Sequence, residues 1–317
     1  ETMMQLTYLT FTAPRRDDDA FASYKNRSKA ELQNMDLNPS SSFSDSITST
    51  LYSKHPRTLR MKADMVDKMN YDKILSMYQD RFKDASDFTF ILVGNVDVEA
   101  VKPLIESYLG SLPSINRKET FKDNHIAMRK GICKNEFIRQ QETPKVNNFI
   151  CYSGTCKYNL RNEILMSMTD QLLNFIYTEK VREDEGGTYG VYPMGQLIKY
   201  PTEKAVLQIF FNTAPDKQEK LIKIIYDEAE AFAKNGPDEA SLNKVKEYML
   251  KKHSEDLKEN GYWLNSIDEY LYTGIDPVKD YEQIINSITP KDVQQFANEL
   301  LKQKNQITVS MISPEKK

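Results

Sequence analysis

Residues 70–78, NYDKILSMY, and residues 289–297, TPKDVQQFA, indicate how this chain is built. Each stretch begins with a residue that commonly caps a helix and continues with apolar residues at helical spacing. At a constant offset of 219 residues, Ile74 aligns with Val293 and needs no gap to do so. The two stretches are therefore predicted to be the same amphipathic helix in two copies of one unit.

Two neighbouring pairs of segments extend this repeat. Apolar side chains occupy every second position of 88–92 and of 307–311, as a half-buried strand requires. Near residues 14 and 237, a Pro followed by acidic residues precedes a second predicted helix. We predict two domains: 1–118, the C-terminal part of a truncated first repeat, and 119–317, a complete second repeat.

The second copy shows its element order in the sequence. Strands are expected at 137–140, 148–152, 189–194, 205–212 and 307–312. Helices are expected at 160–181, 217–234, 238–258 and 290–302. Strand pairs followed by runs of helices predict an α+β fold, with helices on one face of a mostly antiparallel sheet. The polar stretch 113–130 is predicted to link the two copies.

Composition excludes several classes of protein. Hydrophobic residues make up 39% and charged residues 28% of the 317 residues, as in soluble globular proteins. A net charge of −3 argues against a nucleic-acid partner, and no apolar run is long enough for membrane insertion. Three Cys residues cannot form a disulfide framework. The sequence begins with Glu1 and shows no signal peptide, so we interpret it as part of a longer protein.

Two local motifs agree with the repeat. Residues 178–191, TEKVREDEGGTYGV, close a helix and open a strand, and residues 89–97, TFILVGNVD, precede LGSLP at 109–113. Together they resemble the pitrilysin/insulinase-type zinc metallopeptidases, the inverted-motif family related to mitochondrial processing peptidase. The resemblance covers nearly the whole chain. It implies a metallohydrolase-type, LuxS/processing-peptidase-like fold, in which four repeats form two halves of a clamshell around a peptide chamber.

The zinc motif of that family, His-x-x-Glu-His, is absent from this sequence. None of His55, His125 and His253 is followed by Glu and His at that spacing. The resemblance therefore implies the C-terminal half, the end of the third repeat plus the fourth, with no catalytic residue and no metal ligand. Zinc would lie on an N-terminal half of the same protein or on a partner subunit. That half and a peptide substrate are the implied partners, and the fragment alone is expected to be inactive.

Arg182 and Tyr189 are the site residues that the resemblance implies. The family's fourth repeat presents an Arg and, seven residues later, a Tyr, and both match here. A guanidinium and a phenol can stabilise the negative charge of a tetrahedral intermediate or bind substrate backbone. Gly186 and Gly187 would allow a sharp turn and a close approach of the peptide. The alternative is an ordinary helix C-terminal cation followed by a strand aromatic.

Other interpretations stay open beside this one. A non-catalytic scaffold or binding subunit on the same fold is the main alternative function, since fold alone does not fix function. His253 and Asp256 are read as a solvated helix face rather than a metal site. The Ser-rich run 39–50 has no features of a serine nucleophile. Family analogy favours a periplasmic or otherwise exported protein, and the cytoplasm is also possible.

Overall fold

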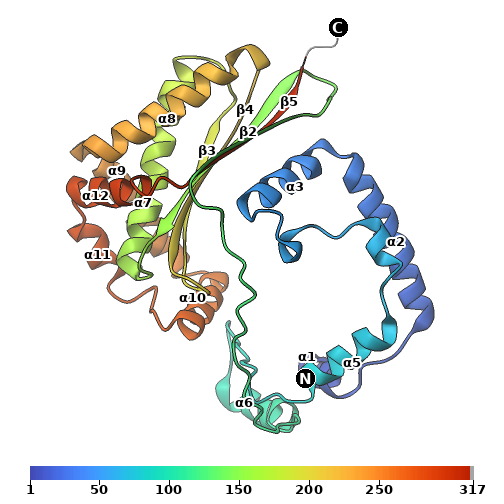
Figure 1. Cartoon of the computed structure of the whole chain (residues 1–317). Helices are drawn as coiled ribbons and strands as arrows, with labels where there is room; N and C mark the ends of the chain where they lie inside the picture. The colour runs from blue at the N-terminus through green and yellow to red at the C-terminus, as the bar shows by residue number, and fades with distance from the viewer. Residues whose placement is uncertain (315–317) are drawn as a thin grey trace. The chain divides into compact units, whose positions relative to one another are not determined.

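The computed structural model describes residues 1–314. The chain forms two compact units. The first unit comprises Glu1–Asn38 and Arg60–Asn124, and the second comprises Pro39–Leu59 and the chain from His125 onward. Figure 1 shows the course of the chain through both.

A five-stranded sheet organises the second unit. Its strands are β1 (Ile132–Ile138), β2 (Lys145–Thr155), β3 (Val191–Ile198), β4 (Lys204–Thr213) and β5 (Gln306–Ser313). They follow the order β1-β5-β2-β4-β3, in which only the β1–β5 pair is parallel. The predicted α+β class with a mostly antiparallel sheet is confirmed. The first strand lies earlier than predicted, and β3 begins two residues after Tyr189.

Helices cover one face of this sheet and form the main core. They are α7 (Leu160–Tyr177), α8 (Gln218–Asn235), α9 (Glu239–Asp256), α10 (Asn260–Thr273), α11 (Tyr281–Ser287) and α12 (Pro290–Leu301). Ile150 and Tyr152 of β2 point toward these helices, while Phe149 and Cys151 point to the other face. The four long helices that were predicted here are confirmed. The short α11 and α10 were not predicted.

The opposite face of the sheet is also covered, which corrects the expectation of helices on one face. The Ser-rich run forms α3 (Pro39–Leu51), whose Leu51 packs against Phe149, Cys151 and Val309. The central strand β2 is apolar on both faces, so each face requires a cover. Periodicity within residues 39–50 gave no sign of this contact, because Ser and Thr dominate the run.

The first unit is built from helices alone. These are α1 (Thr2–Thr12), α2 (Asp18–Leu37), α4 (Ala63–Val66), α5 (Tyr71–Phe82) and α6 (Val98–Leu104), the last continued by a π-helical turn. Asp17 and Asn70 cap α2 and α5 with their side chains, as predicted. Phe11 lies at the centre of a small aromatic cluster, with ring centroids 5.0 Å from Phe82 and 4.8 Å from Phe88.

The predicted strand at 88–92 is wrong. Within the described part of the chain, these residues form no β-ladder. A strand exists only when a neighbouring strand completes its backbone hydrogen bonds, and no described strand lies beside this segment. Residues 113–130 form neither helix nor strand, as expected of a linker.

The start of that stretch is fixed by Asp84. Its buried carboxylate accepts N–H groups of Ser86 (3.1 Å), Ile115 (3.0 Å) and Arg117 (2.6 Å). Burial opposes ionisation of this group. These hydrogen bonds outweigh that effect and hold the pKa of Asp84 below its ordinary value.

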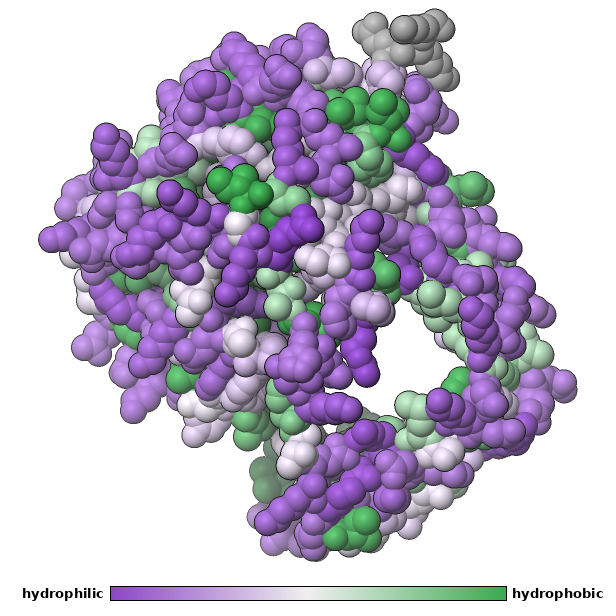
Figure 2. Space-filling view, in the orientation of Figure 1, coloured by the Kyte–Doolittle hydropathy of each residue, from purple (hydrophilic) through white to green (hydrophobic). Residues whose placement is uncertain are grey.

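The visible face of the chain is mostly hydrophilic, with hydrophobic side chains scattered over it (Figure 2). Among residues 1–314, no helix combines the length and the apolar character that a membrane span needs.

Candidate functional site

The predicted site residues lie on one short segment between α7 and β3. A π-helical turn, Thr178–Glu183, continues α7 beyond Tyr177. Val181 in this turn is fully buried, and the next residue, Arg182, is exposed. Single π-helical turns occur frequently beside functional sites. The core contact of Val181 therefore fixes the point from which Arg182 leaves the helix.

The two glycines of the segment serve different purposes, one in its backbone conformation and one in its packing. Gly186 has a φ of +56°, in the left-handed region that side chains disfavour, and its N–H donates to the Arg182 carbonyl (3.1 Å). A Cβ atom on Gly187 would lie 2.7 Å from Leu221 of α8. The Thr213 hydroxyl of β4 donates to the Gly187 carbonyl (2.7 Å). The turn is thus attached to both the helix layer and the sheet.

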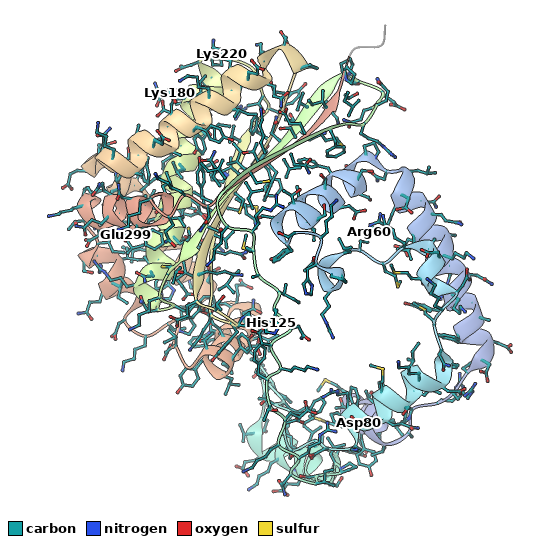
Figure 3. All side chains as sticks on the ribbon, in the orientation of Figure 1. Arg60, Asp80, His125, Lys180, Lys220 and Glu299 are labelled. Carbon is teal, nitrogen blue, oxygen red and sulfur yellow. The ribbon has the colours of Figure 1, made fainter. Side chains whose placement is uncertain are left out.

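Ion pairs hold the outer side of the same segment. Glu185 pairs with Lys220 of α8 (2.5 Å), and Lys180 lies 3.5 Å from Asp184. Lys180 and Lys220 lie at the same end of the second unit (Figure 3). Exposed pairs of this kind contribute little to stability, so their effect here is on the orientation of the segment.

Arg182 and Tyr189 present free hydrogen-bond donors. Tyr189 is 89% exposed, and within residues 1–314 neither side chain forms a hydrogen bond or an ion pair. Tyr189 lies outside the sheet because Thr188 and Gly190 close a local turn through the Thr188 hydroxyl (3.0 and 3.2 Å). The structure brings both residues onto one segment, and no bond joins them to each other.

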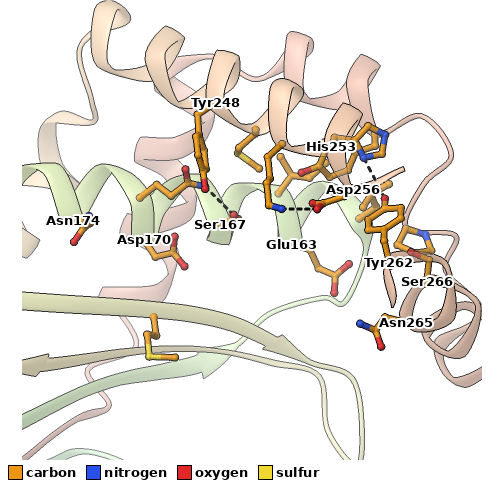
Figure 4. Close-up of a pocket in the computed structure, with 18 of the residues that line it drawn as sticks. Glu163, Ser167, Asp170, Asn174, Tyr248, His253, Asp256, Tyr262, Asn265 and Ser266 are labelled. Atoms are coloured by element: carbon orange, nitrogen blue, oxygen red, sulfur yellow. Dashed lines mark hydrogen bonds and ion pairs between the residues drawn. The ribbon is translucent and has the colours of Figure 1, made fainter. Parts of the chain in front are cut away.

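A cavity of about 1050 Å³ lies elsewhere in the second unit, and the sequence did not predict it. Its walls come from α7, α9, α10, α11 and residues 192–194 of β3 (Figure 4). Glu163, Ser167, Asp170 and Asn174 follow one face of α7 at steps of four, three and four residues. This polar stripe on a largely buried helix is the one sequence signal that could have revealed the cavity.

Two carboxyl groups of the cavity are strongly perturbed. Burial raises the pKa of Glu163 to about 7, and the neighbouring Glu269 charge adds to this shift. Burial raises the pKa of Asp170 to about 6, although the Gly195 N–H donates to its carboxylate (3.0 Å). Both groups therefore favour the neutral form more than an exposed carboxyl does.

His253 corrects the expectation of a solvated helix face. It is buried, stacks on Tyr281 with ring centroids 4.4 Å apart, and shares a 3.2 Å hydrogen bond with Tyr262. Tyr262 in turn meets Trp263 edge-on at 6.0 Å. Contacts between α9, α10 and α11 bury the imidazole, and no pattern within α9 could show them. Asp256 instead pairs with Lys252 (2.5 Å).

The described residues do not fit a zinc site. Nowhere in residues 1–314 do three His, Cys, Asp or Glu side chains lie together so that they could hold a metal ion. Cys133, Cys151 and Cys156 are all free thiols. Burial raises the pKa of Cys151 to about 12, which leaves it unreactive as a thiolate.

Residues 68–249, more than half of the chain, match the sequence pattern of the peptidase M16 inactive domain. This chain belongs to that family. The resemblance to the pitrilysin-type peptidases is thereby confirmed, together with the status of this chain as a non-catalytic domain of zinc-protease-like proteins.

Curated relatives of this M16 inactive-domain chain are much longer. It is 21% identical over 311 residues to "Probable zinc protease PqqL" of Escherichia coli, which covers 95% of this chain and 32% of that protein. It is 23% identical over 292 residues to "Zinc protease PQQL-like" of Arabidopsis thaliana, covering 84% and 29%. The chain thus spans about a third of the length of these relatives.

Solved structures show the same fold. The periplasmic protease PqqL from Escherichia coli superimposes with a TM-score of 0.82 at 18% identity, covering 98% of this chain and 34% of that one. The peptidase M16 inactive domain from Pseudomonas fluorescens gives a TM-score of 0.73 at 18% identity, covering 99% and 76%.

Proposed function

We propose that this chain is the metal-free C-terminal part of a zinc-dependent endopeptidase, where it closes the peptide chamber and contacts the substrate. The observation that carries the proposal is the pair of unbonded donors, Arg182 and Tyr189, on a segment held at Gly187. Family membership and the zinc-protease relatives support it. Zinc and the general base would belong to the N-terminal half of the same protein or to a partner subunit.

The two side chains have a defined chemical role in this proposal. Peptide hydrolysis places negative charge on the former carbonyl oxygen, and a guanidinium and a phenol can donate hydrogen bonds to it or to the adjacent substrate backbone. A donor that is fixed before the substrate arrives costs no reorganisation during the reaction. The bonds at Gly186 and Gly187 hold the backbone that carries the two side chains, and contact with the substrate would order the side chains themselves.

The proposal is tested in the full-length protein with a quenched fluorescent peptide. Arg182→Ala and Tyr189→Phe are each expected to lower kcat/KM by at least about tenfold, or about 1.4 kcal/mol. Arg27→Ala and Tyr24→Phe on α2 change exposed residues of the same types and serve as controls. Unchanged kcat/KM in both site variants would contradict the assigned role.

The domain prediction becomes part of the same proposal: 1–118 ends one repeat and 119–317 forms the next. Equal helix lengths support it, because α5 and α12 each have 12 residues and begin 219 positions apart. The helix pairs α2 and α9, and α3 and α10, each begin 221 positions apart. The small change in offset falls in a connecting loop.

A non-catalytic scaffold or binding subunit remains the second candidate. The missing metal-ligand group within residues 1–314 and the family's description as an inactive domain favour it. A full-length protein without peptidase activity, but with tight binding of unfolded peptides, would decide for this alternative.

We also propose an exported, periplasmic location, by analogy with the periplasmic protease PqqL. Fractionation of cells that carry the tagged full-length protein tests this. Recovery with cytoplasmic markers would contradict it.

A further inference from the structure

The cavity beside α7 has the composition of a ligand site. Its volume of about 1050 Å³ is at the upper end of the range for binding pockets. Half of the 22 lining residues are aromatic or apolar and the other half are polar or charged, so the cavity offers both apolar contact and hydrogen-bonding groups. The aromatic members of the lining are Phe175, Tyr192, Tyr248, Tyr262 and Tyr281. In Figure 4, Glu163, Asp170 and Asn174 point from α7 into the open space.

The charges of the lining are unbalanced. The carboxylates are Glu163, Asp170, Asp256 and Glu269, and the one lysine or arginine among the described lining residues is Lys252. Lys252 already pairs with Asp256 (2.5 Å). Among residues 1–314, the other three carboxyl groups form no ion pair. A cavity of this kind attracts a cation and disfavours an anion.

Glu163 of α7 and Glu269 of α10 form a pair of acceptors in the lining of the cavity. The Tyr158 hydroxyl donates to Glu269 (2.8 Å) and lies within hydrogen-bonding reach of Glu163. One phenol proton cannot satisfy two carboxylates. Partial burial raises the pKa of Glu163, and repulsion by the Glu269 charge adds to the shift. A cationic group seated between them would supply the missing donors.

The edge strand β3 limits how a peptide can bind here. Pro193 has no N–H, and the N–H of Gly195 already donates to Asp170 (3.0 Å). Pro193 and Gly195 are two residues apart, so their backbone groups face the same edge of β3, the edge away from β4. The middle of β3 therefore has no free N–H group that an added strand could use. Recognition must therefore come from side chains in the cavity rather than from a new β-ladder.

We propose that this cavity binds a basic side chain, the guanidinium of Arg or the ammonium of Lys, carried by an extended peptide. Glu163 and Glu269 accept its hydrogen bonds, and Tyr248 and Tyr262 flank its apolar stem. The peptide nature of the ligand rests on the proposed function. The preference for positive charge rests on the cavity alone.

Fluorescence anisotropy with the 317-residue chain tests the proposal. The probes are the fluorescein-labelled peptide GSALRALSG and the same peptide with citrulline in place of arginine. The arginine peptide is expected to bind at least about tenfold more tightly. In the Glu163→Gln and Glu269→Gln double variant this preference should fall below about threefold. Glu247→Gln with Glu282→Gln, at two exposed positions outside the cavity, should preserve it.

Three outcomes would overturn the inference. These are equal binding of the two peptides, an unchanged preference in the double variant, or displacement of the peptide by spermidine at lower concentration than by the unlabelled peptide. If circular dichroism shows that the double variant does not fold, Glu163→Gln alone is measured, with an expected loss of about threefold. Activity lost in Arg182→Ala without arginine preference in the cavity would refute this inference and leave the proposed function intact. The converse result would refute only the proposed function.

Discussion

Two helices of this chain match in length and in their first turn but have different surroundings. α5 and α12 have equal lengths and equivalent caps, Asn70 and Thr289. Met77 of α5 is 61% exposed, while its counterpart in α12, Phe296, is 8% exposed. The segments that follow diverge in the same way, since β5 lies between two strands and residues 88–92 pair with none in the described chain.

The different burial of α5 and α12 shows which structural features a sequence determines locally and which depend on a partner surface. Caps and apolar spacing act locally, so they form the helix wherever they occur. Burial and strand formation need a partner surface, which the second unit supplies with β1–β4. The apolar stripe of α5 therefore predicts a contact that the described chain does not make.

The largest expected effect tests this contrast directly. Phe296→Ala should lower the free energy of unfolding by about 3–5 kcal/mol, because it opens a cavity between α12 and the sheet. Met77→Ala should cost less than about 1 kcal/mol in the 317-residue chain. Urea unfolding followed by circular dichroism gives both values. Equal losses would show that the exposed and buried copies do not differ as described.

The Met77→Ala variant also tests the proposal that the first repeat is completed in the full-length protein. In the full-length protein, Met77→Ala is expected to cost about 2–5 kcal/mol if a sheet covers α5 there. An effect that stays below about 1 kcal/mol in the full-length protein would argue against a completed first repeat.

A second comparison uses pH, because the two units carry carboxyl groups whose pKa values are shifted in opposite directions. The raised pKa values of Glu163 and Asp170 mean that the folded second unit retains protons that the unfolded chain releases. Their stabilising contribution is full below the ordinary values of 4.5 and 3.8 and is lost as pH rises to about 6–7. After allowance for solvent screening, the free energy of unfolding should fall by about 2 kcal/mol over this pH range.

Asp84 in the first unit behaves in the opposite way. Its lowered pKa gives a contribution that is present above 3.8 and is lost as pH falls further. Amide exchange of α7 and α5 at pH 5 and pH 7, corrected for intrinsic rates, separates the units. The slope for α7 should flatten in Glu163→Gln. Over this pH range α5 should show no change, because the Asp84 contribution is lost only below pH 3.8. A flat α7 profile in the wild-type chain would contradict the shifts assigned to Glu163 and Asp170.

The smallest expected effects should be the same in both copies. Asn70→Ala and Thr289→Ala each remove a side chain that accepts an N–H at the first turn of a helix. Each substitution should cost about 1 kcal/mol, because capping does not depend on the sheet. Unfolding curves of the two variants check this. A much larger loss for Thr289→Ala would mean that its capping box also supports tertiary contacts.

Local patterns predicted much of this fold. The caps at Asn70, Thr289 and Asp238 were readable because their causes lie within a few residues. Apolar alternation predicted β5 correctly, but the same pattern at 88–92 did not form a strand, because a strand also needs a partner. The family motif predicted the segment from Arg182 to Tyr189 as the candidate site. Its role in catalysis stays a prediction.

Features that depend on distant contacts were not readable. The Ser-rich α3 covers the sheet because β2 needs cover on both faces, and His253 is buried because α10 and α11 pack against it. The cavity also arises from five separate elements, α7, α9, α10, α11 and β3, so only the polar stripe of α7 hinted at it. In each case the deciding partner lies far away in the sequence.

Trp263, the single tryptophan of the sequence, is an intrinsic fluorescence probe. Trp263 donates its indole N–H to the Leu257 carbonyl (2.9 Å) and contacts Tyr262, which lines the cavity and bonds to His253. We expect its emission to change when the position of Tyr262 changes, because the two rings are in contact. Peptide binding in the cavity can therefore be followed by the shift of the Trp263 emission in the unlabelled wild-type chain. No second tryptophan contributes to the signal.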